Sequence, residues 1–245
     1  MRSYGREGVV EKIRAEGGEI YAITSEPQRL ALMAKTEWEF DFESIGDPHH
    51  EISGACEARG WLKLFVNKQI GSFINDGPVY AHPKGHFQPG VLALDSNGRV
   101  LYRWRGVPTR KNMGGATERP VASYVFEKII QALDASDNPS NANLDNSPEL
   151  DSRGLPWPVF VSLLTANGWF IKPKPFPYLS DGPTVEQRAK RAVIRIPFFV
   201  AAWATAFVTL PTTWVGVALL GYAAWLTPHI RQVNRYFQNE QVPET

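Results

Sequence analysis

A long uncharged run near the C-terminus constrains this chain more than any other feature. The run begins at Ile196 and ends at Pro228, and it contains no Asp, Glu, Lys, Arg or His. As one straight helix it would measure about 50 Å at 1.5 Å per residue, which exceeds the roughly 30 Å hydrocarbon core of a bilayer. Pro211 lies at its midpoint, so we expect two shorter helices over residues 196–210 and 214–226.

The charges around this run indicate where its two ends lie. Basic residues flank it on both sides, namely Arg188, Lys190, Arg191 and Arg195 before it and Arg231 and Arg235 after it. Because basic flanks tend to stay in the cytosol, both ends are expected on one side of a membrane. We interpret residues 188–236 as a transmembrane helical hairpin that contacts lipid. A single tilted span and a buried helical pair are the alternatives, although a buried pair normally has a polar face, which this run lacks.

The remainder of the chain has the composition of a globular protein in a reducing compartment. The net formal charge of +1 gives no reason to expect a nucleic-acid partner. The single cysteine, Cys56, cannot form an intramolecular disulfide. The N-terminus is charged and lacks the apolar core of a signal peptide. We therefore expect a membrane protein whose globular domain faces a reducing, cytosolic or stromal-type compartment.

Hydrophobic periodicity predicts alternating helices and strands before residue 134. The expected elements, in order, are helix 6–16, a buried strand 19–24, helix 28–36, an extended stretch 38–45, helix 49–58, strands 90–94 and 99–104, and helix 121–133. The last two strands are the clearest, because a short turn containing Asn97-Gly98 joins two β-rich runs into a hairpin. This order predicts an α/β domain over residues 1–134, with one mixed sheet flanked by helices.

The composition changes after residue 134. Asp, Asn, Ser and Pro dominate residues 134–153, so we expect a flexible, solvated linker over 135–154. A Pro-rich segment, 155–187, follows and is expected to lie at the membrane interface. Its residues 172–177 are expected to be an extended spacer, and a tail, 237–245, ends the chain.

Three stretches of the first domain resemble a known family. They are residues 20–27 (IYAITSEP), 45–48 (IGDP) and 88–104 (QPGVLALDSNGRVLYRW). Their order and spacing are similar to those of the peroxiredoxin-like branch of the thioredoxin-like superfamily, the alkyl hydroperoxide reductase and thiol-specific antioxidant proteins. The resemblance covers about residues 5–133. It implies a thioredoxin-like fold and a membrane-anchored thiol oxidoreductase or peroxidase that uses a peroxide and a thiol reductant without a bound cofactor.

The chain departs from this family at the place where the family's chemistry occurs. The family's peroxidatic cysteine lies between the first strand and the first helix of the fold, whereas no cysteine precedes the first helix expected here. We hypothesise a shortened gene product that lacks this strand and its nucleophile and is catalytically impaired. The alternative is a non-catalytic thioredoxin-like module that binds or anchors a partner at a membrane.

Several residues are candidates for a functional site. Cys56 is the only thiol, but its place late in a helix fits a small buried side chain better than a nucleophile, which needs a helix N-terminus or a nearby cation. By resemblance, Pro89 is a cis proline that faces the active site. Backbone amides and guanidinium groups suit oxyanions, so the loop 105–120 is a candidate site for an anion or a partner. Its residues of interest are Arg105, Arg110, Gly114, Gly115 and Arg119.

The histidines do not predict a metal site. His49, His50, His82 and His86 lack the ligand spacing of a structural zinc site, and no C-x-x-C pair accompanies them. We therefore expect these histidines on the surface or in loops, with no metal bound.

Overall fold

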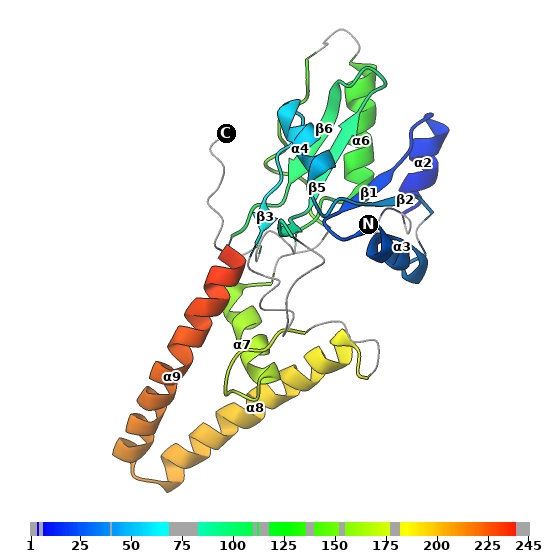
Figure 1. Cartoon of the computed structure of the whole chain (residues 1–245). Helices are drawn as coiled ribbons and strands as arrows, with labels where there is room; N and C mark the ends of the chain where they lie inside the picture. Colours follow the sequence, from blue (N-terminus) through cyan, green and yellow to red (C-terminus); the bar gives the residue numbers. More distant parts are fainter. Residues whose placement is uncertain are drawn as a thin grey trace. The chain divides into compact units, whose positions relative to one another are not determined.

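The computed structural model describes residues 4, 7–39, 41–68, 83–109, 112, 118–135, 140–151, 155–176 and 182–238. Over these residues the chain is mixed α/β, with seven helices and three small sheets (Figure 1). The contacts divide it into two compact units. Unit 1 holds the described residues up to 151, and unit 2 holds those from 155 onward.

The first half of unit 1 alternates helices and strands, as predicted. Its elements are α2 (Val9–Ala15), β1 (Tyr21–Thr24), α3 (Gln28–Glu37), β2 (Glu43–Gly46) and α4 (Glu51–Ala58). Strands β1 and β2 are parallel, with Tyr21 opposite Glu43 and Thr24 opposite Gly46. Because α3 connects them, the pair has the crossover that parallel strands require.

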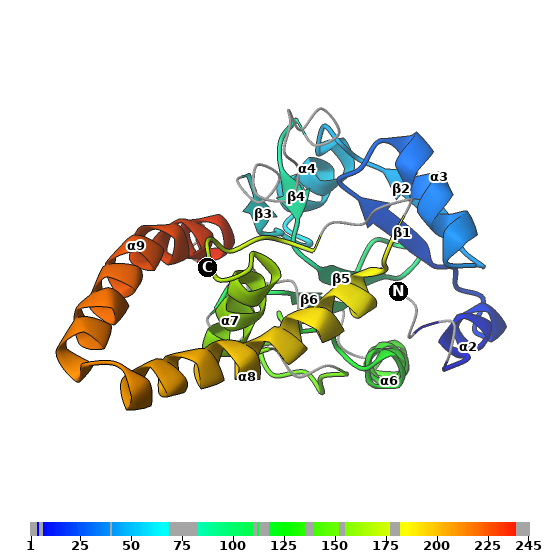
Figure 2. The ribbon, with the colours of Figure 1, turned by 90° about the horizontal axis from the view of Figure 1, so that it is seen from below.

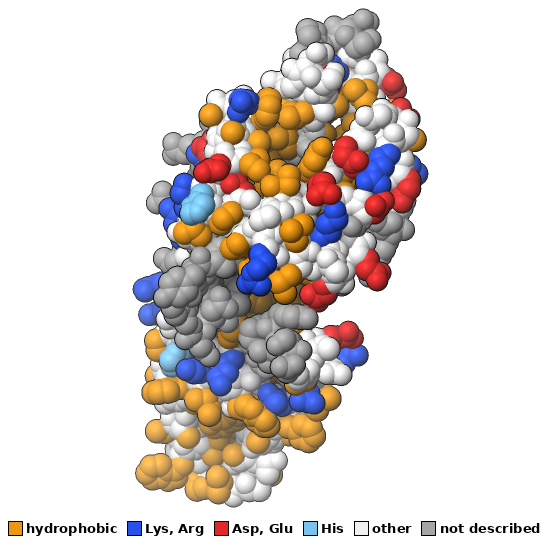
Figure 3. Space-filling view, turned by 45° about the vertical axis from the view of Figure 1, so that its right-hand side comes forward, with side chains coloured by type: hydrophobic (Ala, Val, Ile, Leu, Met, Phe, Trp, Pro, Cys, Tyr) orange, Lys and Arg blue, Asp and Glu red, His pale blue; other side chains and the backbone are white. Residues whose placement is uncertain are grey.

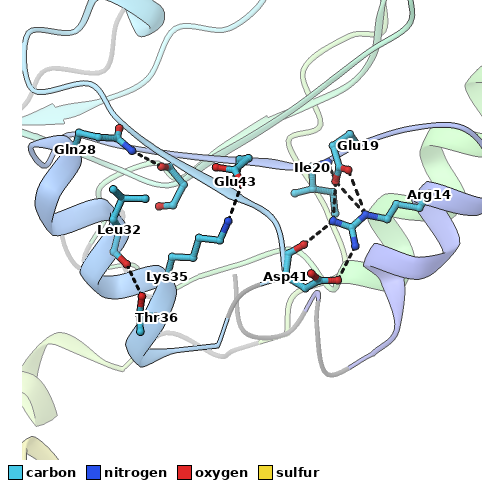
Figure 4. A network of polar contacts seen from close by, with 10 residues as sticks. Arg14, Glu19, Ile20, Gln28, Leu32, Lys35, Thr36, Asp41 and Glu43 are labelled. Atoms are coloured by element: carbon cyan, nitrogen blue, oxygen red, sulfur yellow. Dashed lines mark hydrogen bonds and ion pairs between the residues drawn. The ribbon is translucent and has the colours of Figure 1, made fainter.

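Polar side chains hold this part together (Figure 4). The Gln28 amide donates to the Ser44 carbonyl at 2.9 Å, and its Oε1 accepts from the Gly46 amide at 2.7 Å, so the start of α3 is tied to β2. Lys35 forms an ion pair of 2.8 Å with Glu43 on the same strand. The guanidinium of Arg14 bridges Glu19 and Asp41, and these exposed ion pairs orient α2 rather than add much stability.

One face of the β1–β2 sheet is exposed, which contradicts the prediction of a buried strand at 19–24. Ala22 is buried with Val10 and Phe42, but the side chains on the opposite face, Tyr21 and Ile23, are 58% and 39% exposed. The strand alternates because its side chains point to opposite faces, and only one face has a covering layer among the described residues.

The second half of unit 1 contains the predicted hairpin. Strand β3 (Val66–Asn67) pairs with β4 (His86–Phe87), and β5 (Gly90–Leu94) pairs with β6 (Val100–Arg105), both antiparallel. Within the turn, Asp95 accepts hydrogen bonds from the amides of Asn97 and Arg99, each at 2.9 Å. Tyr102 and Trp104 of β6 pack on Val125 of α6 (Ala122–Asp134), which forms the main core of this half.

The expectation of one mixed sheet is wrong. The described strands form three two-stranded sheets, β1–β2, β3–β4 and β5–β6. Hairpin β5–β6 forms from a local turn and β1–β2 from a single crossover. A continuous sheet would require a ladder between these pairs, and no described strand makes one. The structure therefore supports a mixed α/β class, while the thioredoxin-like fold stays a prediction.

The segment 140–151 is part of unit 1, in contrast to the predicted flexible linker. The Ala142 and Asp145 amides donate to carbonyls of β6, at 2.8 and 2.9 Å. The hydroxyls of Tyr102 and Tyr124 both donate to Oδ2 of Asp145 at 3.0 Å. A segment with few apolar side chains can still be held by backbone and carboxylate hydrogen bonds. Composition does not reveal such bonds, and it therefore suggested a linker.

The described residues of unit 2 form three helices, α7 (Trp157–Asn167), α8 (Val185–Thr209) and α9 (Thr212–Gln238). Helix α8 begins with a capping box between Thr184 and Gln187. The predicted break at Pro211 is confirmed, since only residues 210 and 211 separate α8 from α9. Both views show these helices meeting at this connection and diverging from it, with α7 between them (Figures 1 and 2). We call α8, α9 and their connection the helical V.

The Pro-rich segment contains a helix, α7, that the sequence analysis did not predict. Pro156 and Pro158 lie at the start of α7, where a missing amide proton costs nothing. Val161, Leu164, Thr165 and Ala166 of α7 are buried, and the main neighbour of this helix is α8. The expected extended spacer is wrong for residues 172–176, because the chain folds back on α7 and the Lys174 amide donates to the Leu164 carbonyl at 2.9 Å.

Candidate functional site

Cys56 lies near the end of α4 and is partly exposed. Burial is the main influence on this thiol and raises its pKa, and Asp47 acts in the same direction. Arg59 lowers the pKa of Cys56 but has the smaller effect. The position near the helix C-terminus gives the thiolate no help from the helix dipole. This environment is that of an unactivated thiol.

Pro89 lies at the entry to the hairpin and its peptide bond is trans, because no described peptide bond is cis. The cis expectation is therefore wrong. The Pro89 carbonyl accepts a hydrogen bond of 2.7 Å from the Gly106 amide, so this proline opens the β5–β6 pair. Trans is the favoured isomer of most X–Pro bonds, and the hairpin is compatible with it.

The described arginines of the candidate anion loop bond to backbone carbonyls. Arg105 donates to the Lys63 carbonyl at 3.2 Å, and its guanidinium lies 5.1 Å from the centroid of the Phe65 ring. Arg119 donates to the Glu118 carbonyl at 2.6 Å. Burial lowers the pKa of both guanidinium groups. Three further residues of this loop lie outside the described residues, namely Arg110, Gly114 and Gly115, so an anion site here stays a prediction.

A polar cluster that the sequence analysis missed lies beyond the carboxyl ends of β1 and β2, where α/β sheets often bind ligands. Ser25 follows β1 and its hydroxyl accepts from the Phe87 amide at 3.2 Å. Asp47 follows β2 and accepts from the amides of Glu51 and Ser53, at 2.6 and 3.0 Å, which caps α4. These bonds attach α4 and β4 to the sheet. The signal in the sequence was the polar residue directly after each strand.

His50 belongs to the same cluster. Its Nε2 lies 3.3 Å from the Gly85 carbonyl, and its ring centroid lies 4.4 Å from that of Phe87. Burial lowers the pKa of the His50 imidazole. Within the described part of the chain, no three side chains of metal-binding type come together. The sequence analysis expected His50 on the surface or in a loop, and the structure places it directly before α4, half-buried and packed on Phe87.

The outer surface of unit 2 exposes large apolar side chains. On α8, Phe198 is 71% and Val208 is 86% exposed, and on α9, Trp214 is 73% and Leu220 is 72% exposed. In the space-filling view, hydrophobic side chains gather at the lower end, where α8 and α9 meet (Figure 3). Among the described helices, α8 alone is long and apolar enough to cross a membrane, and only 6% of its apolar window is buried. An apolar surface of this extent marks a place for lipid or a partner.

The inner surface of the V is packed with aromatic rings. Phe170, from the loop after α7, stacks on Phe199 of α8 at 3.9 Å between centroids. Tyr222 of α9 lies 5.6 Å from Phe199 and 6.1 Å from Trp203, and its hydroxyl donates to the Phe170 carbonyl at 2.8 Å. These rings thus fill part of the inside of the V, and the exposed apolar side chains of α8 and α9 are left for an external contact.

Comparisons of the chain with protein-family models, curated proteins and solved structures find no match. The peroxiredoxin-like resemblance therefore rests on the three stretches of sequence alone. Redox activity stays a prediction.

Proposed function

We propose that this chain is a membrane-anchored α/β protein in which unit 2 inserts into a bilayer and unit 1 is a non-catalytic binding or anchoring module. The observation that carries the proposal is the exposed apolar outer surface of the V. Transfer of one large apolar side chain out of water contributes about 1.5–3 kcal/mol. Phe198, Val208, Trp214 and Leu220 together would thus contribute on the order of 5–10 kcal/mol in lipid.

The charge pattern supports lipid rather than a soluble helical pair. A helix that packs on a globular domain normally has one apolar and one polar face. In the V, apolar side chains instead cover all sides between Arg195 and His229, and the charged residues lie only beyond these limits. Such a distribution along the helix axis, rather than around it, is typical of insertion into a membrane.

Substitution of one apolar side chain on each helix of the V tests the anchor. We expect the double variant Val208→Asp and Leu220→Asp to lose membrane binding roughly a hundredfold or more, because one Asp at the centre of an inserted helix costs about 2.5–3.5 kcal/mol. Flotation of the full chain with lipid vesicles on a density gradient measures the bound fraction. The matched control is Leu32→Asp and Met33→Asp, two exposed apolar residues of α3 in unit 1, and it should float like the unaltered chain. Equal flotation of both double variants would refute the anchor.

The thiol environment supports a non-catalytic unit 1 over the oxidoreductase implied by the resemblance. Burial raises the pKa of the Cys56 thiol. At a pH below this pKa, the folded chain therefore holds less thiolate than the unfolded chain. We therefore expect slower alkylation by iodoacetamide in the folded chain than in guanidinium at pH 8. The difference should shrink as the pH rises above the raised pKa, where both thiols ionise.

A peroxide assay separates the two functions directly. We expect the full chain and its Cys56→Ser variant to consume hydrogen peroxide in the presence of dithiothreitol at the same low rate. Faster alkylation in the folded state, together with peroxide consumption that Cys56→Ser abolishes, would establish the thiol peroxidase instead.

A further inference from the structure

The described part of unit 2 is strongly basic at one end. Residues 155–176 and 182–238 contain a single acidic side chain, Glu186, whereas the chain as a whole has a net charge of only +1. The basic side chains of these ranges are Lys172, Lys174, Arg188, Lys190, Arg191, Arg195, Arg231 and Arg235. We call them the basic collar, because they lie at the open end of the V and in the loop after α7. Blue side chains border the orange apolar end in Figure 3.

Both apolar arms of the V are shorter than the hydrocarbon core is thick, although α8 with its basic first turns included is long enough to cross a membrane. The arm of α8 between Arg195 and the tip covers residues 196–210, which is about 22 Å of helix. The arm of α9, from Pro211 to Pro228, is about 27 Å long. The hydrocarbon core is roughly 30 Å thick, and arms that diverge from a common tip reach less deep than their length. The tip therefore ends inside the core, with both charged ends on the side of entry.

The loop after α7 marks the depth of insertion. The guanidinium of Arg195 lies 3.7 Å from the centroid of the Trp169 ring and donates to the Ala166 carbonyl at 3.1 Å. From the other arm, the Trp225 indole donates to the Ile171 carbonyl at 3.1 Å. The loop is thus tied to α8 and α9 while Trp169 and Ile171 remain 66% and 63% exposed. An exposed tryptophan next to Lys172 is the combination found at the lipid headgroups.

We infer that unit 2 is an anchor for one leaflet of an anionic phospholipid membrane, with the apolar V among the acyl chains and the basic collar against the phosphates. The inference rests on the membrane anchor proposed above and adds its depth, sidedness and lipid class. Charge complementarity selects the lipid, because each Lys or Arg near an anionic surface raises binding about fivefold and Glu186 is the only acidic side chain in the described part of unit 2. Phosphatidylglycerol represents the anionic class in the experiment.

The lipid class is tested with a charge reversal. The full chain should float with vesicles of phosphatidylcholine and phosphatidylglycerol. A triple variant should bind these vesicles more weakly, by about a hundredfold or more; it combines Lys172→Glu, Arg231→Glu and Arg235→Glu. The matched control carries the same change of net charge on exposed residues of unit 1, namely Lys12→Glu, Arg29→Glu and Lys84→Glu, and should bind as before. Equal binding to phosphatidylcholine alone, or equal loss in both variants, would overturn the anionic assignment.

The depth is tested by labelling single cysteines in a Cys56→Ser background. A membrane-impermeant maleimide added outside the vesicles should label Val193→Cys of α8 and Gln232→Cys of α9, which both lie beyond the apolar arms. The reagent should leave Thr213→Cys at the tip unlabelled, both when it is added outside the vesicles and when it is enclosed in their lumen. Labelling of the tip from the lumen would mean a span and would overturn the one-leaflet anchor. The membrane anchor itself would be refuted if the full chain floated with neither type of vesicle, or if it formed a stable oligomer that did not bind vesicles.

Discussion

Replacing Trp104 by alanine is expected to destabilise unit 1 by about 3–5 kcal/mol, the range for a large aromatic side chain removed from a core. Trp104 is 4% exposed and lies on the face of β6 that also carries Tyr102. Together with Val125 of α6, these rings join the hairpin to its helix. A domain is stable by only about 5–15 kcal/mol in total. This loss would therefore leave unit 1 with little stability, and it would unfold in moderate denaturant.

The measurement is amide hydrogen exchange of the full chain on vesicles, followed in β6 and α6 by mass spectrometry. The matched control is Trp38→Ala, since Trp38 is 42% exposed after the end of α3. Substitutions of exposed side chains usually change stability by less than about 0.5–1 kcal/mol, so protection in the control should stay near that of the unaltered chain. Equal loss of protection in both variants would show that the Trp104 cluster is not the core of unit 1.

Local signals in the sequence were sufficient for the helices of unit 1, for the break at Pro211 and for the hairpin, but not for α7. Asp95 and Asn97-Gly98 form their turn from hydrogen bonds within a few residues, and Pro211 ends α8 because it cannot continue the helix. The same reasoning placed Cys56 late in α4, where its thiol is not activated. Each of these features depends on neighbours along the chain.

Features that depend on distant residues were missed. Asp145 holds the segment 140–151 by accepting from Tyr102 and Tyr124, which are 43 and 21 residues away. Nothing in the composition of that segment signals such a bond. The same applies to the separation of the sheet into three pairs and to Ser25, whose hydroxyl accepts from the distant Phe87 amide. Periodicity describes which face of an element is apolar, but not which element covers it.

The loop after α7 also escaped prediction, and its geometry makes Gly168 the most sensitive position of unit 2. A Cβ on this residue would lie 1.7 Å from the carbonyl oxygen of Lys172. The backbone of Gly168 is ordinary, with φ of −86°, so the requirement for glycine comes from space alone. Trp169 and Phe170 follow with φ of 55° and 59°, left-handed values that are unfavourable for bulky residues.

Gly168→Ala is therefore expected to open this loop, at a cost of about 3 kcal/mol or more. The Lys172 carbonyl must move, which separates Trp169 from Arg195 and Ile171 from Trp225. Proteolysis of the free chain should then cut within 168–172, and binding to anionic vesicles should weaken because the exposed tryptophan is no longer held at the headgroups. Gly221→Ala is the matched control.

A Cβ on Gly221 meets nothing within 4 Å, and alanine favours a helix over glycine by about 1 kcal/mol. The control should therefore keep its loop intact and bind vesicles at least as well as the unaltered chain. If Gly168→Ala resists proteolysis and binds like Gly221→Ala, the loop does not set the depth of the V. In that case the collar of α8 and α9 alone would hold unit 2 at the membrane surface.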